Sequence, residues 1–360
     1  MRDAIVYSGS GWESCNVMER LAVALSKLGA RVLYCDNPVS RLKEKPRQAH
    51  EIEPGIFRFR SRIFGHRLNQ VRLLASLQSR MVANEISLAA EKLRLHKPIF
   101  FYSYMGRLLP VCAEMKRHGC FLVHMCMDFP EIDYQAHVSS ADLTLTIALA
   151  SVDPIRAIAG ARVVLVPQFG PPEVAVDNGN SAGTEPAALQ NIPRPRLIYT
   201  GVLQNRVQLP IVREILQSKP QWHFIHIGSP DNLILPNAHA LPWMRRDELM
   251  RVIASSNAGF MPYDRRDPVQ RNVFVPLKLL DYFGVGMPVI STPIEGMLEL
   301  KDLVYTGESA SELTGAIELA LNEPADSSKR DRRKEFAREH SLENFAALLR
   351  KILPLEEFGH

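Results

Sequence analysis

Two charged side chains stand three residues apart in a stretch that is predicted to be helical. They are Lys278 and Asp281, in the run Pro276-Leu-Lys-Leu-Leu-Asp-Tyr-Phe-Gly284. On a helix, residues three apart share a face, so a cation and a carboxylate would be presented together. The cation can bind a phosphate and the carboxylate can accept from two sugar hydroxyls, which are the two parts of a nucleotide sugar. The alternative is a solvated ion pair on a helix surface.

Helix and strand signals predict the elements around this pair. Pro276 suits a first helical turn, apolar residues follow at helical spacing, and glycines end the helix. These apolar residues and glycines are Leu277, Leu280, Phe283, Gly284 and Gly286. Residues 288–292, Pro-Val-Ile-Ser-Thr, then predict a short buried strand.

The run from Pro276 to Thr292 resembles the donor-site signature of two-domain (GT-B) glycosyltransferases, most of all family 4 and bacterial enzymes such as the xanthan glucuronosyltransferase. Many family 4 enzymes carry two glutamates eight positions apart. Here Asp281 takes the second place and Val273 stands in the first. The resemblance implies an α/β chain of two Rossmann-like domains, with parallel sheets that face an interdomain cleft. It also implies a nucleotide-sugar site that includes Pro276, Leu277, Lys278 and Asp281.

The second half of the chain supplies further residues for that site. Residues 196–200 predict a strand, followed by Gly201 and then Arg206, which resembles the family's Gly-x-Leu-x-x-Arg loop. By that resemblance the glycine lets backbone approach the donor diphosphate, while Arg206 and Lys278 form an anion clamp around the leaving group. Four more residues are expected beside the donor: Trp243 and Met244 at the nucleobase, and Tyr263 and Arg271 near the phosphates.

The first half opens with the pattern strand, glycine loop, helix, strand, which is typical of a βαβ unit. The loop puts Gly9 and Gly11 at the carboxyl edge of the sheet, where α/β proteins bind ligands, although it is not a G-x-G-x-x-G fingerprint. The resemblance places this loop, with Trp12 and Glu13, under the transferred sugar, and Glu13 is a catalytic candidate. The alternative is a tight turn with Trp12 as a packing residue.

Carboxylates gather where the apolar run 120–126 ends. In related GT-B enzymes this strand end carries an acidic residue that faces the acceptor, and by that resemblance Asp128 is the candidate general base. Proton removal from a hydroxyl requires a carboxylate within hydrogen-bond reach. Glu131, Asp133 and His124 compete for the role, and the alternative makes Asp128 a helix N-cap or a turn residue.

Residues 41–80 form a basic region with apolar residues at helical spacing (Val71, Leu74, Leu77 and Met81). Such a surface can lie against anionic lipid or bind a pyrophosphate, and both uses suit an acceptor carried on a polyprenyl pyrophosphate. A solvated helix face is the alternative. Nucleic acid is a weaker option, because no aromatic residues are interleaved in a recognisable module.

Composition sets the broad class. With 360 residues, 46% hydrophobic and 23% charged, the chain suits two globular domains, and its formal net charge is only +4. The five scattered cysteines predict reduced thiols, and no signal peptide or membrane-spanning run is seen. We therefore expect cytoplasmic residence, with peripheral contact at the inner membrane allowed. Metal, Walker A and G-x-S-x-G motifs are absent from the sequence, which predicts a metal-independent enzyme without a cofactor.

The predicted domains are residues 1–172 for the acceptor and 196–340 for the nucleotide sugar, joined by a Pro- and Gly-rich linker at 173–195. Residues 341–360 are expected to form a helix that crosses back to the first domain. The sequence as a whole favours a glycosyltransferase that moves a sugar from a nucleotide diphosphate, most simply UDP, to a hydroxyl of a saccharide or lipid-linked saccharide. An epimerase or phosphorylase on the same fold, and a non-catalytic sugar-nucleotide-binding subunit, are the alternatives.

Overall fold

The computed structural model describes residues 2–8, 11–12, 16–41, 48–65, 71–129, 133–170, 185–203, 206–228, 233–272 and 275–355. The chain divides into two compact units, Met1–Pro167 with Leu342–His360, and Gln168–Ser341. The linker predicted at residues 173–195 is not a linker over its second part. Residues 185–195 belong to the second unit, because Leu189 and Ile192 are buried in its core.

The first unit is built on a sheet with the strand order β3-β4-β2-β1-β5-β6-β7-β8. The paired strands are parallel except for β3 and β4, which are antiparallel. Continuous buried runs such as Ala4–Tyr7 are typical of parallel strands with both faces covered. The strands are β1 Ala4–Tyr7, β2 Val32–Ser40, β3 His50–Glu53, β4 Ile56–Ile63, β5 Ile99–Tyr102, β6 Phe121–Cys126, β7 Leu143–Thr146 and β8 Val163–Leu165.

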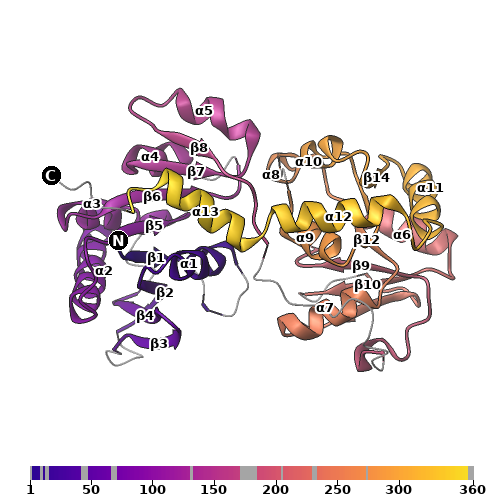
Figure 1. Ribbon diagram of the computed structural model, residues 1–360, viewed down its shortest axis with the longest axis horizontal. Helices are drawn as coiled ribbons and strands as arrows, with labels where there is room; N and C mark the ends of the chain where they lie inside the picture. Colours follow the sequence, from indigo (N-terminus) through magenta and orange to yellow (C-terminus); the bar gives the residue numbers. More distant parts are fainter. Residues whose placement is uncertain are drawn as a thin grey trace. The chain divides into compact units, whose positions relative to one another are not determined.

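Helices cover this sheet (Figure 1). They are α1 Val17–Lys27, α2 Arg72–Lys92, α3 Pro110–Arg117, α4 Tyr134–Ser140, α5 Val152–Arg156 and α13 Leu342–Ile352. Side chains of β1 and β2 such as Ile5 and Leu33 share a core cluster with Val82 of α2 and Val111 of α3. The alternate residues of these strands face the other way, and α1 packs against α13. Within α13 the buried residues repeat at helical spacing, as in Leu342, Phe345 and Leu349.

The second unit has a wholly parallel sheet with the order β11-β10-β9-β12-β13-β14. Numbered within the unit, this is the 3-2-1-4-5-6 order of the Rossmann fold. The strands are β9 Arg196–Thr200, β10 His223–Ile227, β11 Ala238–Leu241, β12 Ala258–Met261, β13 Val289–Ser291 and β14 Val304–Thr306. The helices, which flank the sheet in Figure 1, are α6 Leu209–Ser218, α7 Arg246–Ala254, α8 Pro268–Arg271, α9 Leu277–Gly284, α10 Glu295–Glu299, α11 Ala310–Leu321 and α12 Ser328–Glu339.

Over the residues of it that the structure describes, the basic region is not one continuous basic surface. Residues 56–63 are the internal strand β4, and their arginines pair with carboxylates. Arg58 and Arg60 both bind Asp36, while Arg62 and Arg41 both bind Glu85. The predicted helical spacing does occur in α2, where Leu77 is exposed. Residues 42–47 and 66–70 of this region lie outside the described residues.

Among the residues that the structure describes, no helix is both long enough and apolar enough to span a bilayer. Cys35, Cys112, Cys120 and Cys126 are free thiols and all four are buried.

Candidate functional site

The carboxyl edge of the second unit's sheet has a topological switch point between β9 and β12. The chain continues from β9 to β10 on one side of this point and from β12 to β13 on the other. In open α/β sheets, ligands bind in the crevice outside the carboxyl ends of two such strands. Gly201 follows β9 directly, and Tyr263 lies just beyond the end of β12 at Met261. This edge is therefore the candidate site.

Lys278 reaches from the first turn of α9 to both strand ends. Its Nζ lies 3.1 Å from the hydroxyl of Tyr263 and 3.4 Å from that of Tyr199. It also stands 4.5 Å from the ring centroid of Tyr199, a cation–π distance. A Cβ built on Gly201 would lie 3.6 Å from Cε and Nζ of Lys278. The structure thus brings together Gly201, Tyr263 and Lys278, three of the residues predicted for the donor site.

The surroundings of Lys278 lower its affinity for a proton. Burial and then the positive charge of Arg206 lower the pKa of Lys278 to about 7, against the opposing effect of Asp281. Burial raises the pKa of Tyr199 and Tyr263 well above the usual value, so both stay neutral. At neutral pH the amine therefore lies between its charged and neutral forms, and a bound anion would favour the charged one.

Glycines at the ends of β9 and β10 let two loops approach closely. Gly201 has φ of +121°, a region that favours glycine. Its carbonyl accepts from Nε2 of His226 at 2.7 Å. A Cβ at Gly228, where φ is +152°, would lie only 2.4 Å from the Gly201 carbonyl oxygen. The backbone at Gly201 is thus held against the end of β10, and a side chain at Gly228 would push it away.

Tyr282 anchors α9 to the sheet. Its hydroxyl accepts from the Thr200 N–H at 3.0 Å and lies 3.3 Å from the Ile198 carbonyl oxygen. The ring covers Gly259 of β12, where a Cβ would come within 2.5 Å of it. Because Lys278 lies one helical turn before Tyr282, this anchor also fixes the position of the Lys278 backbone, from which the side chain extends.

Asp281 has a different environment from the one predicted. It is 6% exposed, and its Oδ1 accepts from Nη2 of Arg246 at 2.8 Å. The alternative interpretation, a solvated pair with Lys278, is wrong, because Asp281 pairs with Arg246 and Lys278 turns to the tyrosines. A sugar hydroxyl would have to compete with Arg246 for this carboxylate.

The other predicted donor residues lie around this edge in varied environments. Arg206 is exposed. Its positive charge adds to the effect of burial in lowering the pKa of Lys278, and it partly offsets the rise that burial causes in the pKa of Tyr199 and Tyr263, so Arg206 lies near all three. Arg271 is exposed at the end of α8. Trp243 follows β11 and is 62% exposed, whereas Met244 packs against the core. Pro276 is the N-cap of α9 rather than part of its first turn, and Leu277 is the first residue of the helix.

The first unit has its own switch point, between β1 and β5. Gly11 and Trp12 lie in the loop after β1, while Gly9 and Glu13 lie outside the described residues. The ring of Trp12 meets that of Tyr34 edge-on, with centroids 4.8 Å apart. This contact is the packing role that the sequence left open for Trp12, whose side chain is half-buried.

Asp128 is exposed, just beyond the carboxyl end of β6. It is not the N-cap of α4, because Asp133 occupies that position. Of the competing candidates for the base, His124 is fully buried and so out of reach of an acceptor in solvent, while Glu131 lies outside the described residues. The part of the chain that the structure describes holds no cluster of three His, Cys, Asp or Glu side chains suited to a metal ion.

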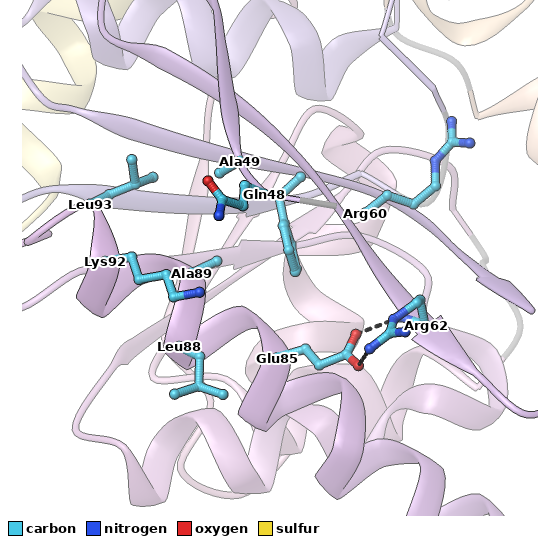
Figure 2. A pocket seen from close by; sticks show the side chains of 10 residues that line it. Gln48, Ala49, Arg60, Arg62, Glu85, Leu88, Ala89, Lys92 and Leu93 are labelled. Carbon is cyan, nitrogen blue, oxygen red and sulfur yellow. Dashed lines mark hydrogen bonds and ion pairs between the residues drawn. The ribbon is translucent and has the colours of Figure 1, made fainter. Parts of the chain in front are cut away.

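A cavity of about 460 Å³ lies in the first unit, between α2 and the segment from Gln48 through β4 (Figure 2). Phe59 and Ala89 are among its apolar lining residues. The ion pair between Arg62 and Glu85, 2.9 Å long, lies on one side of it and Lys92 on the other. None of the residues predicted for the donor site, the sugar loop or the base lines this cavity, whereas Arg60 and Arg62 of the basic region do.

Two features of the sites were missed from the sequence. Tyr199 contacts Lys278, but it lies inside an apolar run that reads as an ordinary buried strand. Asp36 binds two arginines, and it did carry a signal, since it follows the apolar run 32–35, although the structure continues β2 beyond it to Ser40.

Comparisons with known proteins bear on the fold. No family model matches the chain. A relative is TuaH of Bacillus subtilis (strain 168), provisionally named a teichuronic acid biosynthesis glycosyltransferase. It is 25% identical over 195 residues, which cover 50% of this chain and 48% of TuaH, so the chain spans about half the length of that relative.

Solved structures match almost the whole chain. The α,α-trehalose 6-phosphate synthase from Burkholderia multivorans superposes with a TM-score of 0.72 at 12% identity, over 98% of both chains. A trehalose-6-phosphate structure from E. coli bound with UDP-2-fluoro glucose gives 0.69 at 11% identity, over 97% of this chain and 98% of that one. At such identities the likeness concerns the fold alone. It confirms the predicted architecture: the chain has the GT-B fold, with two Rossmann-like α/β domains.

Proposed function

We propose that this protein is a glycosyltransferase that moves a sugar from a nucleotide diphosphate sugar, most simply a UDP sugar, to a hydroxyl of a saccharide or lipid-linked saccharide. The observation that carries the proposal is the position of Lys278. Its amine lies beside Gly201 and Tyr263 at the switch point of the second unit, where open α/β sheets bind ligands.

The chemistry requires neutralisation of the leaving group. As the bond between the sugar and the diphosphate breaks, the departing oxygen gains negative charge, and nearby cations stabilise the transition state. Lys278 and Arg206 are the cations that we assign to this task, with Arg271 as a third near the phosphates. The backbone at Gly201 lets the diphosphate approach without a side chain in the way.

The acceptor is activated in the first unit. Its oxygen attacks the anomeric carbon, and its proton passes to a base, for which Asp128 is our candidate. The loop with Gly9, Gly11, Trp12 and Glu13 is assigned to the sugar, and Trp243 and Met244 to the nucleobase. No metal ion or cofactor enters the proposed reaction.

The names of similar proteins support a UDP-linked donor and a polysaccharide product. The E. coli structure was bound with UDP-2-fluoro glucose, and TuaH is named for teichuronic acid biosynthesis. We extend both features to this chain, together with its resemblance to family 4 and the xanthan-type enzymes. A membrane-bound acceptor would bring the protein to the cytoplasmic surface of the inner membrane.

The test is a thermal-shift screen over UDP, ADP and GDP sugars, followed by calorimetry with the best of them. We expect a UDP sugar to stabilise the wild-type protein and Lys278→Met to weaken its binding at least about tenfold, the cost of losing a charged hydrogen bond. Lys301→Met, at an exposed lysine of the second unit, should bind as the wild type does.

The other outcomes separate the alternatives. If no nucleotide sugar binds, the proposal is wrong. UDP sugar binding without release of UDP across a panel of acceptors would indicate a non-catalytic binding subunit. Isomerisation or hydrolysis of the donor without acceptor would indicate an epimerase, and phosphate-dependent reversal would indicate a phosphorylase.

A further inference from the structure

Two arginines of β4 share one carboxylate of β2. Oδ2 of Asp36 accepts from Nε of Arg58 at 2.8 Å and from Nη2 of Arg60 at 3.0 Å. Asp36 is 1% exposed, whereas the side chains of Arg58 and Arg60 are 28% and 32% exposed. The carboxylate is therefore covered by the two guanidinium groups, and solvent meets the cations rather than the anion.

This cluster lies partway along β2 and β4, level with the carboxyl end of β1. Asp36 follows Cys35, which pairs with Tyr7 at the end of β1. Nη2 of Arg58 would lie 3.7 Å from a Cβ built on Gly11, so the guanidinium group stands against the loop after β1. That loop is the one assigned above to the sugar.

Arg58 has hydrogen-bond donors to spare. Its Nε is used by Asp36, but no acceptor for Nη1 or Nη2 is found within the described parts of the chain. Besides Asp36, the carboxylate of Glu19 also acts on nearby Tyr34. Glu19 accepts a hydrogen bond from the side-chain amide of Asn16. The outer edge of the Arg58 guanidinium thus presents parallel N–H groups, which match the two oxygens of a carboxylate or phosphate.

We propose that Arg58, fixed by Asp36 and supported by the charge of Arg60, binds an anionic group of the acceptor, a phosphate or a carboxylate. The inference rests on the proposed function, because it names the chemical class of that acceptor. It requires no residue of the donor site, so the two can fail separately.

The experiment measures anion binding to the full chain at constant ionic strength, without donor. Thermal shift and calorimetry are run with glucose 6-phosphate, glucuronate, inorganic phosphate and, as the neutral control, glucose. We expect at least one anionic sugar to bind where glucose does not, and Arg58→Gln to weaken that binding about tenfold or more. Arg58→Lys keeps the charge but loses the planar fork, so it should restore binding only in part.

Arg156→Gln is the matched control, because Arg156 is an exposed arginine of the same unit whose side chain is 65% exposed. It should bind the anions as the wild type does. A preference for glucose 6-phosphate identifies a phosphate-bearing acceptor, and a preference for glucuronate an acidic sugar. If inorganic phosphate binds as tightly as the anionic sugars, the site recognises the anionic group and not the sugar that carries it.

Two results would overturn the inference: no anion binds the wild type, or Arg58→Gln binds as tightly as the wild type. The second would leave the cluster with the structural role of joining β2 to β4. UDP binding is measured on the same samples. If Arg58→Gln binds UDP normally but does not bind the anions, the anion site is separate from the donor site. If the wild-type protein does not bind UDP, the proposed function itself is wrong.

Discussion

The amine of Lys278 and the hydroxyl of Tyr263 lie 3.1 Å apart, and this contact joins the start of α9 to the end of β12. The amine is surrounded by neutral phenols and by the charge of Arg206, with no carboxylate bound to it in the described structure. A cation held in this way is incompletely compensated until an anion arrives. Both its binding chemistry and its cost to stability follow from that.

Donor binding should therefore depend on pH. In the free protein the pKa of Lys278 is about 7, and a diphosphate beside the amine raises it. Binding then takes up a proton, and affinity falls as pH rises above 7, by at most about tenfold per pH unit. Calorimetry with UDP-glucose in two buffers of different ionisation enthalpy measures the uptake, because the diphosphate diester itself does not titrate in this range. Equal affinity from pH 6.5 to 8.5 would show that the amine stays charged or does not touch the phosphates.

The same amine should reduce stability in the absence of ligand. Its pKa is about 7 in the folded chain, below the usual 10.5, so folding disfavours the charged form. Stability rises from pH 7 towards 10.5 as the unfolded chain alone keeps the proton, and the cost is greatest below pH 7. The substitution Lys278→Met removes this cost to the stability of the folded protein. We expect the melting temperature at pH 7 to rise by roughly 2–4 °C for each kcal/mol recovered. The difference from the wild type should narrow by pH 10, and a lower melting temperature at pH 7 would contradict the lowered pKa.

The resemblance to GT-B enzymes, rather than spacing alone, assigned Gly201 and Lys278 to one site, and local signals agreed with their places in the chain. Gly201 and Lys278 stand at element ends, where glycine and helix-start patterns mark the boundary. The partners of these residues were harder to predict. Arg246 pairs with Asp281 from another helix, and Tyr199 meets Lys278 from inside a strand. Such contacts depend on how elements pack, which residue spacing along one segment does not encode.

The basic region shows the same limit in the first unit. Its charges were visible in the sequence, and so was the strand-like alternation of Arg58, Arg60 and Arg62 with Phe59 and Ser61, but the prediction rested on the charges alone. Their neutralisation depends on Asp36 and Glu85, which lie on separate elements. A run of basic residues therefore indicated a surface where the fold contains a network of ion pairs.

Gly228→Ala should impair the donor site through the backbone. The new Cβ would lie 2.4 Å from the carbonyl oxygen of Gly201, so the loop after β9 must move. We expect a loss of about 1–3 kcal/mol in the free energy of unfolding and weaker UDP-glucose binding. Gly284→Ala is the control, since a Cβ there meets nothing within 4 Å and the residue ends α9. That variant should be neutral or slightly stabilised. Unchanged UDP-glucose binding by a folded Gly228→Ala protein would mean that the Gly201 loop does not contact the donor.

Asp128→Asn should separate binding from transfer. The amide keeps the size of the side chain but cannot accept the acceptor proton, so the rate of transfer should fall by about 10²–10⁴ while UDP-glucose binds as before. Asp153→Asn, at a side chain of the first unit that is 93% exposed, should leave both unchanged. The pH profile gives a second measurement: in the wild type the rate falls at acidic pH as the base is protonated, and Asp128→Asn should lose that limb. Undiminished turnover by Asp128→Asn would assign proton removal to another group, and Glu131 or Glu13 would then be the next residues to replace.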